Sequence, residues 1–225
     1  MNAMERVEDN GYLTDYPNGT NAVIGDSPET MTAIYEEQIN LVVVQRSLPD
    51  EIAHYCQELV DTKPNFNLRL AINPEQAAES LTSLPNLTGH AAFVDDLVLL
   101  VDMYSCLFDL DEVGLRLQVL DRAMCPRFHI DRLGCRLVTT YQGPGTEWLR
   151  NGDVDRRKLG AGNMGLSDAE SGLYSDVTDI QQVNKGDIVL LKGEGWYGNE
   201  GLGAVHRSPF ITPAEKRVVV TMDFA

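Results

Sequence analysis

The first half of the chain carries apolar residues at the three-to-four-residue spacing of amphipathic helices. Helices are predicted from Pro49, from Pro74 and from His90. The last of these, HAAFVDDLVLLVDMYSCLFDL, is apolar on most sides, but its aspartates favour a central packing helix over a membrane span. Before the helices, INLVVVQR (39–46) has the β-branched residues of a buried strand.

Beyond about residue 112 the pattern changes to short β-branched segments separated by turn residues. The strand candidates are 113–120, 127–131, 135–142, 177–183, 187–193 and 217–224. Short strands with regular turn signals are typical of β-sandwiches and barrels. The glycine-containing stretch 156–172 predicts a long loop with one helical turn, and loops of that length often form lids or binding elements.

A chain of 225 residues with this layout predicts a single domain, 1–225. Residues 1–30 lack any period and are rich in polar and glycine residues, so they are expected to form a loosely ordered arm. Residues 31–111 are expected to be a mainly helical N-terminal part. Residues 112–225 are expected to form the β core.

The charge of the chain narrows its partners. Eighteen Lys and Arg stand against 34 Asp and Glu, which gives a net charge of −16. Such a charge repels nucleic-acid phosphates and anionic membrane surfaces, so neither is expected as a partner. The N-terminal sequence has no signal-peptide pattern and no apolar run reaches membrane-spanning length, so a cytoplasmic protein is predicted. The oligomeric state has no signature in the sequence.

Candidate chemistry begins in CPRFHID (125–131), where His129 and Asp131 stand two residues apart. Side chains two apart on a strand share a face. A second histidine, His206, follows the strand DIVLLKG. Two histidines and one carboxylate make the facial triad that suits non-haem iron(II) and leaves coordination positions open for substrate and dioxygen.

A 2-oxo acid that chelates such a metal needs a partner for its far carboxylate. Arg217 opens the final strand eleven positions after His206, and a guanidinium can clamp a carboxylate. The alternative is a salt-bridged arginine at a strand edge. Thr139 and Tyr141 share a face with each other and could offer hydroxyls to the same acid, although Tyr141 could equally be a packing aromatic.

Two tryptophan-containing segments are candidates for the substrate pocket. Glu147 and Trp148, in GPGTEWL, could line its mouth, because glycines let the backbone approach a ligand closely. Trp196, in the glycine-rich approach to His206, could form its rim. The alternatives are a turn with a core tryptophan and a simple surface turn.

The cysteines leave a second metal site open. The chain has four of them and no CxxC pair, so a disulfide framework is not expected. Cys125 and Cys135 lie on either side of the His129–Asp131 triplet, which allows a soft Cys/His site for zinc. Against it, the standard zinc spacings are absent.

The C-terminal run GDIVLL, followed by His206 and by Arg217 in a strand of alternating apolar residues, resembles the ending of the Fe(II)/2-oxoglutarate-dependent dioxygenases. The resemblance covers about residues 113–225. It implies an α+β fold in which the N-terminal helices pack on a C-terminal double-stranded β-helix, a jelly roll of the cupin-like kind. It also implies metal ligation by His129, Asp131 and His206 and binding of the 2-oxoglutarate carboxylate by Arg217.

A closer similarity lies in CPRFHID followed by RLVTTYQGPGTEWL, which is similar to an uncharacterised bacterial family, domain of unknown function 1826. That similarity brings no activity or substrate with it. The expected function is therefore an oxygenase that uses Fe(II) and a small-molecule cosubstrate, 2-oxoglutarate, on a substrate that the sequence does not define. Zinc or nickel could also occupy the site, because divalent affinity orders favour them over iron.

The alternative function is a non-enzymatic protein that binds zinc or iron with the same cupin-like fold. In either case both histidines must be neutral to ligate a metal. We therefore expect metal affinity to fall as the pH drops below about 6.5, the ordinary pKa of histidine.

Overall fold

The computed structural model describes residues 21–225, so residues 1–20 of the expected arm lie outside the described residues. Residues 21–30 differ from the expectation, because they are part of the folded domain. They include strand β1 (Ala22–Gly25) and the start of the 3-10 helix η1 (Pro28–Tyr35). Strand β1 pairs in parallel with β2 (Leu41–Val44), whose four residues are all buried.

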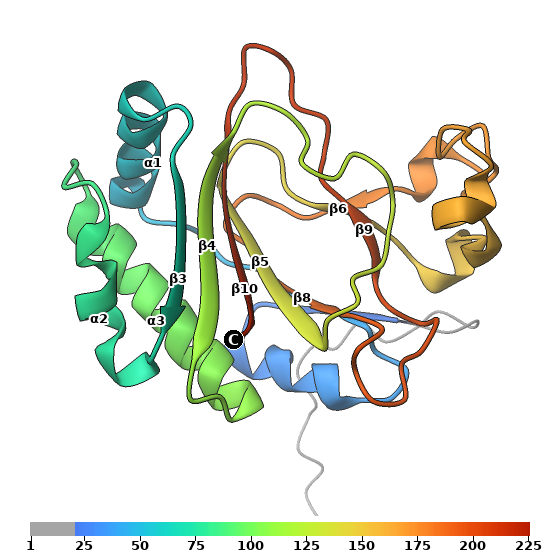
Figure 1. Cartoon of the computed structure of the whole chain (residues 1–225), viewed down its shortest axis with the longest axis horizontal. Helices are drawn as coiled ribbons and strands as arrows, with labels where there is room; N and C mark the ends of the chain where they lie inside the picture. Colours follow the sequence, from blue (N-terminus) through green and yellow to red (C-terminus); the bar gives the residue numbers. More distant parts are fainter. Residues whose placement is uncertain (1–20) are drawn as a thin grey trace, which may run out of the picture.

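Two facing sheets confirm the predicted jelly roll (Figure 1). The major sheet has the strand order β1-β2-β8-β5-β10-β4-β3 and the minor sheet has the order β7-β6-β9. The strands not yet given are β3 (Asn67–Ile72), β4 (Val113–Leu120), β5 (Cys135–Gln142), β6 (Glu147–Leu149), β7 (Gln181–Gln182), β8 (Ile188–Lys192), β9 (Val205–Arg207) and β10 (Arg217–Phe224). Strand β10 lies between β4 and β5 and is antiparallel to both, so it is a central strand.

The helices cover the outer face of the major sheet (Figure 1). They are α1 (Asp50–Thr62), α2 (Ala77–Ser80) and α3 (His90–Phe108), so the helices expected from Pro49 and His90 are present. The helix expected from Pro74 is broken into three short turns, η2 (Pro74–Gln76), α2 and η3 (Leu81–Ser83). Among the helices that residues 21–225 form, none is both long and apolar enough to span a bilayer.

Strands from both ends of the chain share the major sheet. The segment expected to be an arm supplies β1 at one edge, and the part expected to be mainly helical supplies β2 beside it and β3 at the other edge. The division near residue 112 is therefore a change in the sequence pattern only, because the major sheet contains strands from both sides of it. This is why the whole described chain forms one layered structure.

Three apolar clusters separate the layers. The first lies between the helices and the major sheet and contains Phe93, Leu137 and Tyr141. The second lies between the two sheets and contains Val138, Trp148 and Val219. The third covers the outer face of the minor sheet, where the loop that follows β6 packs over Val205. Adjacent residues of β5 thus face different layers, as the alternation of a strand requires.

Several short elements differ from the sequence expectation. Residues 127–131 do not form a strand and make only one isolated bridge, between His129 and His206. Residues 177–183 give a 3-10 turn, η7 (Val177–Asp179), and the two-residue strand β7. The predicted loop 156–172 carries two 3-10 turns, η5 (Arg156–Lys158) and η6 (Gly160–Asn163), rather than one helical turn, and a further 3-10 turn, η4 (Asn151–Asp153), precedes it.

Candidate metal centre

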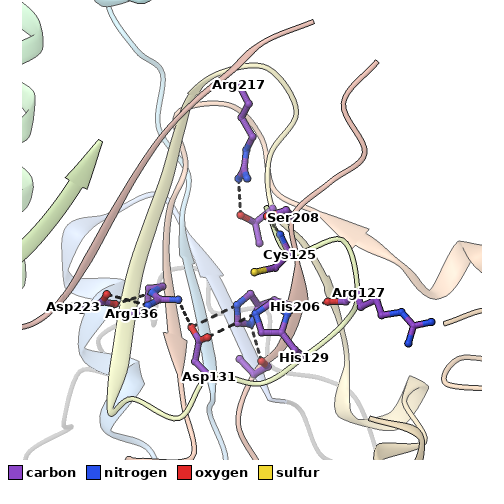
Figure 2. A network of polar contacts seen from close by, with 11 residues as sticks. Cys125, Arg127, His129, Asp131, Arg136, His206, Ser208, Arg217 and Asp223 are labelled. Atoms are coloured by element: carbon purple, nitrogen blue, oxygen red, sulfur yellow. Dashed lines mark hydrogen bonds and ion pairs between the residues drawn. The ribbon is translucent and has the colours of Figure 1, made fainter. Parts of the chain in front are cut away.

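His129, Asp131 and His206 converge at one end of the space between the sheets (Figure 2). One ligand atom from each lies within 4.8 Å of the others. The Asp131 carboxylate is 3.7 Å from Nε2 of His129 through Oδ1 and 3.7 Å from Nε2 of His206 through Oδ2. Two segments that are far apart in the sequence thus supply three donors to one point.

The backbone brings the two histidines together. His129 and His206 form an antiparallel bridge in which each backbone N–H donates to the other's carbonyl at 3.0 Å. Residues in such a pair place their side chains on the same side of the sheet. The ring centroids are accordingly 4.5 Å apart.

Hydrogen bonds orient both imidazoles. Nδ1 of His129 lies 2.9 Å from the carbonyl oxygen of Arg127, and Nδ1 of His206 lies 2.9 Å from that of Ala204. A carbonyl only accepts, so each Nδ1 carries the proton and donates it. Each Nε2 then keeps its lone pair, and both lone pairs are available on the side of Asp131.

Burial keeps His206 in the form that ligates metals. Its side chain is nearly inaccessible, and this desolvation lowers the pKa of His206 well below its ordinary value, with the nearby His129 ring lowering it further. The Asp131 carboxylate acts in the opposite direction but is outweighed. A neutral imidazole is the metal-binding form of histidine.

Arg136 fixes the orientation of the Asp131 carboxylate. Its Nη1 donates to Oδ2 of Asp131 at 2.8 Å, while its Nε and Nη2 donate to Asp223 at 2.7 and 3.0 Å. Of the two Asp131 oxygens, only Oδ2 accepts a hydrogen bond from the described residues. Oδ1 is therefore the oxygen with its full acceptor capacity left for a cation.

Arg217 borders a cavity of about 50 Å³ that His129 and His206 also line. It is 2% exposed on the central strand β10, so it is not the strand-edge arginine of the alternative reading. Nη2 donates to the hydroxyls of Thr140 and Thr146 at 2.8 and 3.0 Å, whereas Nε has no partner among the described residues. Desolvation lowers the pKa of Arg217 to about 10.

A buried guanidinium that meets only neutral hydroxyls is costly unless an anion completes its surroundings. Within the described part of the chain, Arg217 forms no ion pair with a carboxylate. The cavity that it borders is also lined by both histidines and by Arg136. Its charge and its unpaired Nε thus mark a place for an anionic group across the cavity from the metal-ligand candidates.

The structure places Thr139 and Tyr141 away from this cavity. Both lie on the helix-facing side of β5, where the Tyr141 hydroxyl donates to Asp96 at 2.6 Å and its ring packs on Phe93. The hydroxyl of Thr139 lies 3.4 Å from a backbone carbonyl on the same side. Thr140 and Thr146, which the sequence reasoning missed, supply the hydroxyls that hold Arg217, and Thr146 also lines the cavity. The strand is present as predicted, but the expectation that Thr139 and Tyr141 face the cosubstrate is wrong, because that side of β5 packs against the helices.

None of the three tryptophan-segment candidates lines the cavity. Trp148 is buried between the sheets, opposite His206 in the pairing of β6 with β9. Glu147 accepts from Arg207 at 2.6 Å. Trp196 packs edge-on against Tyr35 in the helix-side cluster.

The two cysteines considered for zinc lie in different layers. Cys135 is fully buried in the helix-side core, and burial raises the pKa of its thiol. Cys125 is exposed and borders the cavity with the two histidines. A site with both thiolates is therefore not formed, and the described metal-ligand cluster consists of His129, Asp131 and His206 alone.

The comparisons with known proteins agree with this architecture. Residues 25–223 match the model of the family described as "Protein of unknown function (DUF1826)", and the chain belongs to this family. No curated protein matches the sequence.

Solved structures share the fold at low sequence identity. The rice dioxygenase for auxin oxidation superposes with a TM-score of 0.52 at 13% identity, over 91% of this chain and 82% of its own. A full-length Neurospora crassa protein, crystallised in complex with alpha-KG, gives a TM-score of 0.50 at 12% identity, over 96% of this chain and 88% of its own. These similarities establish the fold that the sequence resemblance implied.

Proposed function

We propose that this protein is a non-haem Fe(II)/2-oxoglutarate-dependent oxygenase. The observation that carries the proposal is the joint lining of one cavity by the histidine pair and by a buried arginine without a carboxylate partner. A metal site alone would not require Arg217. The fold shared with the rice dioxygenase and with the Neurospora crassa protein supports the proposal and does not by itself assign the activity.

The donor set fits a divalent iron. Two imidazole nitrogens and one carboxylate oxygen satisfy one face of an octahedron, which is the arrangement of non-haem Fe(II) oxygenases. His129 and His206 already carry their protons on Nδ1, so neither must be reoriented for Nε2 to ligate. Asp131 would supply a third donor through Oδ1, and its negative charge offsets part of the charge of the cation.

The surroundings of Arg217 fit the far carboxylate of 2-oxoglutarate. Thr140 and Thr146 hold Nη2, which leaves Nε and the remaining N–H groups to donate to that carboxylate. A guanidinium in such a dry place binds a carboxylate more strongly than an exposed one, because water screens the interaction less. Val138 and Val219, which also line the cavity, would exclude water between the two ends of the cosubstrate.

Fe(II) with 2-oxoglutarate supplies oxidising power, since dioxygen is consumed as 2-oxoglutarate becomes succinate and carbon dioxide while an oxygen atom goes to the substrate. The chain's own residues would bind the metal and the 2-oxo acid and orient them. His129, Asp131 and His206 would hold the metal through one donor atom each. Arg217 fixes which end of the 2-oxo acid faces the histidines.

Anaerobic addition of Fe(II) and 2-oxoglutarate tests the proposal. We expect a visible charge-transfer band from the chelated cosubstrate, and succinate formation once dioxygen is admitted. Arg217→Met should keep metal binding and weaken 2-oxoglutarate binding by about ten- to a hundredfold, the worth of hydrogen bonds to a charged group. Asp131→Asn should weaken metal binding itself.

Arg46→Met is the matched control, because Arg46 is a partly buried arginine paired with Asp96 on the helix side of the major sheet. It should leave both the band and the cosubstrate affinity unchanged. Tight zinc binding with neither band nor succinate would instead identify a non-enzymatic metal-binding protein. Equal effects of the two arginine variants on 2-oxoglutarate binding would remove the role given to Arg217.

A further inference from the structure

Arg136 joins two carboxylates that belong to different parts of the fold (Figure 2). Its guanidinium faces Asp223 with Nε and Nη2 and faces Asp131 with Nη1, all at 2.7–3.0 Å. The side chains of Arg136, Asp131 and Asp223 are 19%, 13% and 13% exposed, so solvent screens their charges only in part. This three-residue chain ends at the candidate metal centre.

The register of the major sheet explains the arrangement. Strands β5 and β10 are antiparallel neighbours in which Leu137 pairs with Met222, so Arg136 and Asp223 occupy the next opposed position. Leu137 and Met222 face the helix-side core. Because side chains alternate along a strand, Arg136 and Asp223 face the other way, into the space between the sheets.

Joining β5 to β10 does not require Asp131. The two hydrogen bonds between Arg136 and Asp223 already form a fork-to-fork pair, which is the favoured geometry for arginine and a carboxylate. The third bond, from Nη1 to Oδ2 of Asp131, goes to a carboxylate that lies outside both strands. It leaves Asp131 with one occupied oxygen and one free oxygen facing His129.

We propose that Arg136 is a positioning residue for the metal centre and that Asp223 makes this role possible. Arg136 restricts Asp131 to ligation through Oδ1, which preserves the open positions of the site. Asp223 neutralises the guanidinium and holds its fork, so that Arg136 neither repels a bound cation nor takes both oxygens of Asp131. This inference rests on the proposed metal site and adds two residues to it.

The charges of the three residues predict opposite changes in cation affinity for two successive substitutions. In the native protein Asp131, Arg136 and Asp223 sum to −1. Asp223→Asn brings the sum to 0 and frees the guanidinium to turn its fork onto Asp131, so cation binding should weaken. Combining Asp223→Asn with Arg136→Met restores −1 and removes the competitor, while the methionine chain keeps most of the arginine stem's packing.

The experiment measures the affinity of the protein for Co(II) or Mn(II) without cosubstrate, together with the visible spectrum of the Co(II) form. D223N should bind either cation about ten- to a hundredfold more weakly than the native protein, as is usual when outer-shell partners of metal ligands are lost. The double variant should bind the cation more tightly than D223N. The gain should exceed about twofold, which is the usual deviation from additivity between independent substitutions. Its Co(II) spectrum should differ from the native one, because both oxygens of Asp131 become available.

Asp96→Asn is the matched control, since Asp96 pairs with Arg46 through both oxygens but on the helix side of the sheet. It should lower stability without changing cation affinity. A double variant that binds no better than D223N would reduce Arg136 and Asp223 to a structural pair and overturn the inference. Absence of cation binding by the native protein would contradict the proposed function instead, so the two failures are distinguishable.

Discussion

At the scale of single residues, the candidate metal centre depends on two backbone carbonyls. Each histidine donates from Nδ1 to the carbonyl two residues earlier in the chain, Arg127 for His129 and Ala204 for His206. The bridge between the two residues then fixes both rings at once. A ligand set that is oriented before the metal arrives loses little conformational entropy on binding, which favours affinity.

His206 should make the metal-free protein sensitive to mild acid. Burial lowers its folded-state pKa toward about 4, whereas the unfolded chain titrates near 6.5. Between these values the unfolded state binds the proton and the folded state does not, so stability falls as the pH decreases through this window. From pH 7 to pH 5 we expect this residue to cost about 1–2 kcal/mol of unfolding free energy.

Urea unfolding of the metal-free protein at pH 7 and pH 5 measures this effect, with His206→Gln as the comparison. Glutamine stays neutral at both values, so its variant should lose less stability on acidification than the native protein. The many carboxylates of the chain titrate in both proteins and cancel in the difference. Identical losses in the two proteins would show that His206 is protonated as readily in the folded state as in the unfolded one.

At the scale of the elements, one strand divides two functions between its faces. The helix-facing residues of β5, such as Tyr141, build the core. On the face toward the minor sheet, Arg136 lines the cavity and Thr140 holds Arg217, which borders it. Neighbours in the sequence therefore serve unrelated purposes. A substitution on one face should leave the other face's property intact.

Thr140→Val and Tyr141→Phe test this division. Loss of the Thr140 hydroxyl removes one of the two groups that hold Arg217, so 2-oxoglutarate should bind about two- to tenfold more weakly. Loss of the Tyr141 hydroxyl removes a donor to the Asp96 carboxylate and should cost about 1–3 kcal/mol of stability without changing cosubstrate affinity. Isothermal titration with 2-oxoglutarate and denaturant unfolding separate the two results, and a weakened cosubstrate affinity in Tyr141→Phe would refute the division.

Long elements could be predicted from the sequence because their periods repeat. The spacing of apolar residues located β4, β5, β10 and the helix at His90 to within a few residues. Strands of two or three residues, such as β6, β7 and β9, contain too few positions for an alternation to be read. They exist because tertiary pairing forms them, and local sequence carries little of that information.

The same limit applies to the site. The sequence could nominate His129, Asp131 and His206 as metal ligands, and Arg217 as a carboxylate-binding residue, because residue type and order along the chain indicate them. Thr140 and Arg136 could not be nominated in this way, because their roles depend on which side of β5 faces the minor sheet and on which strands are neighbours. Thr146 could not be nominated either, because its contact with Arg217 joins the segment after β5 to a distant strand. The facing side of a strand is set by contacts with residues distant in the sequence, and it alternates from one residue to the next. Thr139 and Tyr141 therefore face the helices, whereas Thr140 between them faces the minor sheet.

At the scale of the whole molecule, the candidate centre is assembled from segments that meet only in the folded state. His129 and Asp131 come from the segment before β5, His206 comes from the minor sheet, and Arg217 comes from the middle of the major sheet. The N-terminal helices do not reach the cavity, yet they cover the opposite face of the sheet that carries Arg217 (Figure 1). Ligand binding and folding must therefore be linked.

This linkage gives a measurable stabilisation. A divalent cation at 100 times its dissociation constant should add about 2.7 kcal/mol to the folded state. For a domain of this size, that corresponds to a rise in Tm of roughly 5–11 °C. 2-Oxoglutarate should add a further rise only when the cation is present, because under the proposed function it would contact both the metal and Arg217. Thermal unfolding with Mn(II), with 2-oxoglutarate and with both together measures the two increments.

Variants assign each increment to its part of the site. Asp131→Asn should reduce the first increment and with it the second, whereas Arg217→Met should keep the first and lose the second. The unfolded chain cannot bring residues 129 and 206 together, so a cation bound at the candidate centre stabilises only the folded state. A cation bound weakly to other carboxylates would instead raise Tm equally in the native protein and in Asp131→Asn. Equal shifts would therefore place the cation elsewhere on this acidic surface. A full second increment in Arg217→Met would show that the buried guanidinium does not bind 2-oxoglutarate.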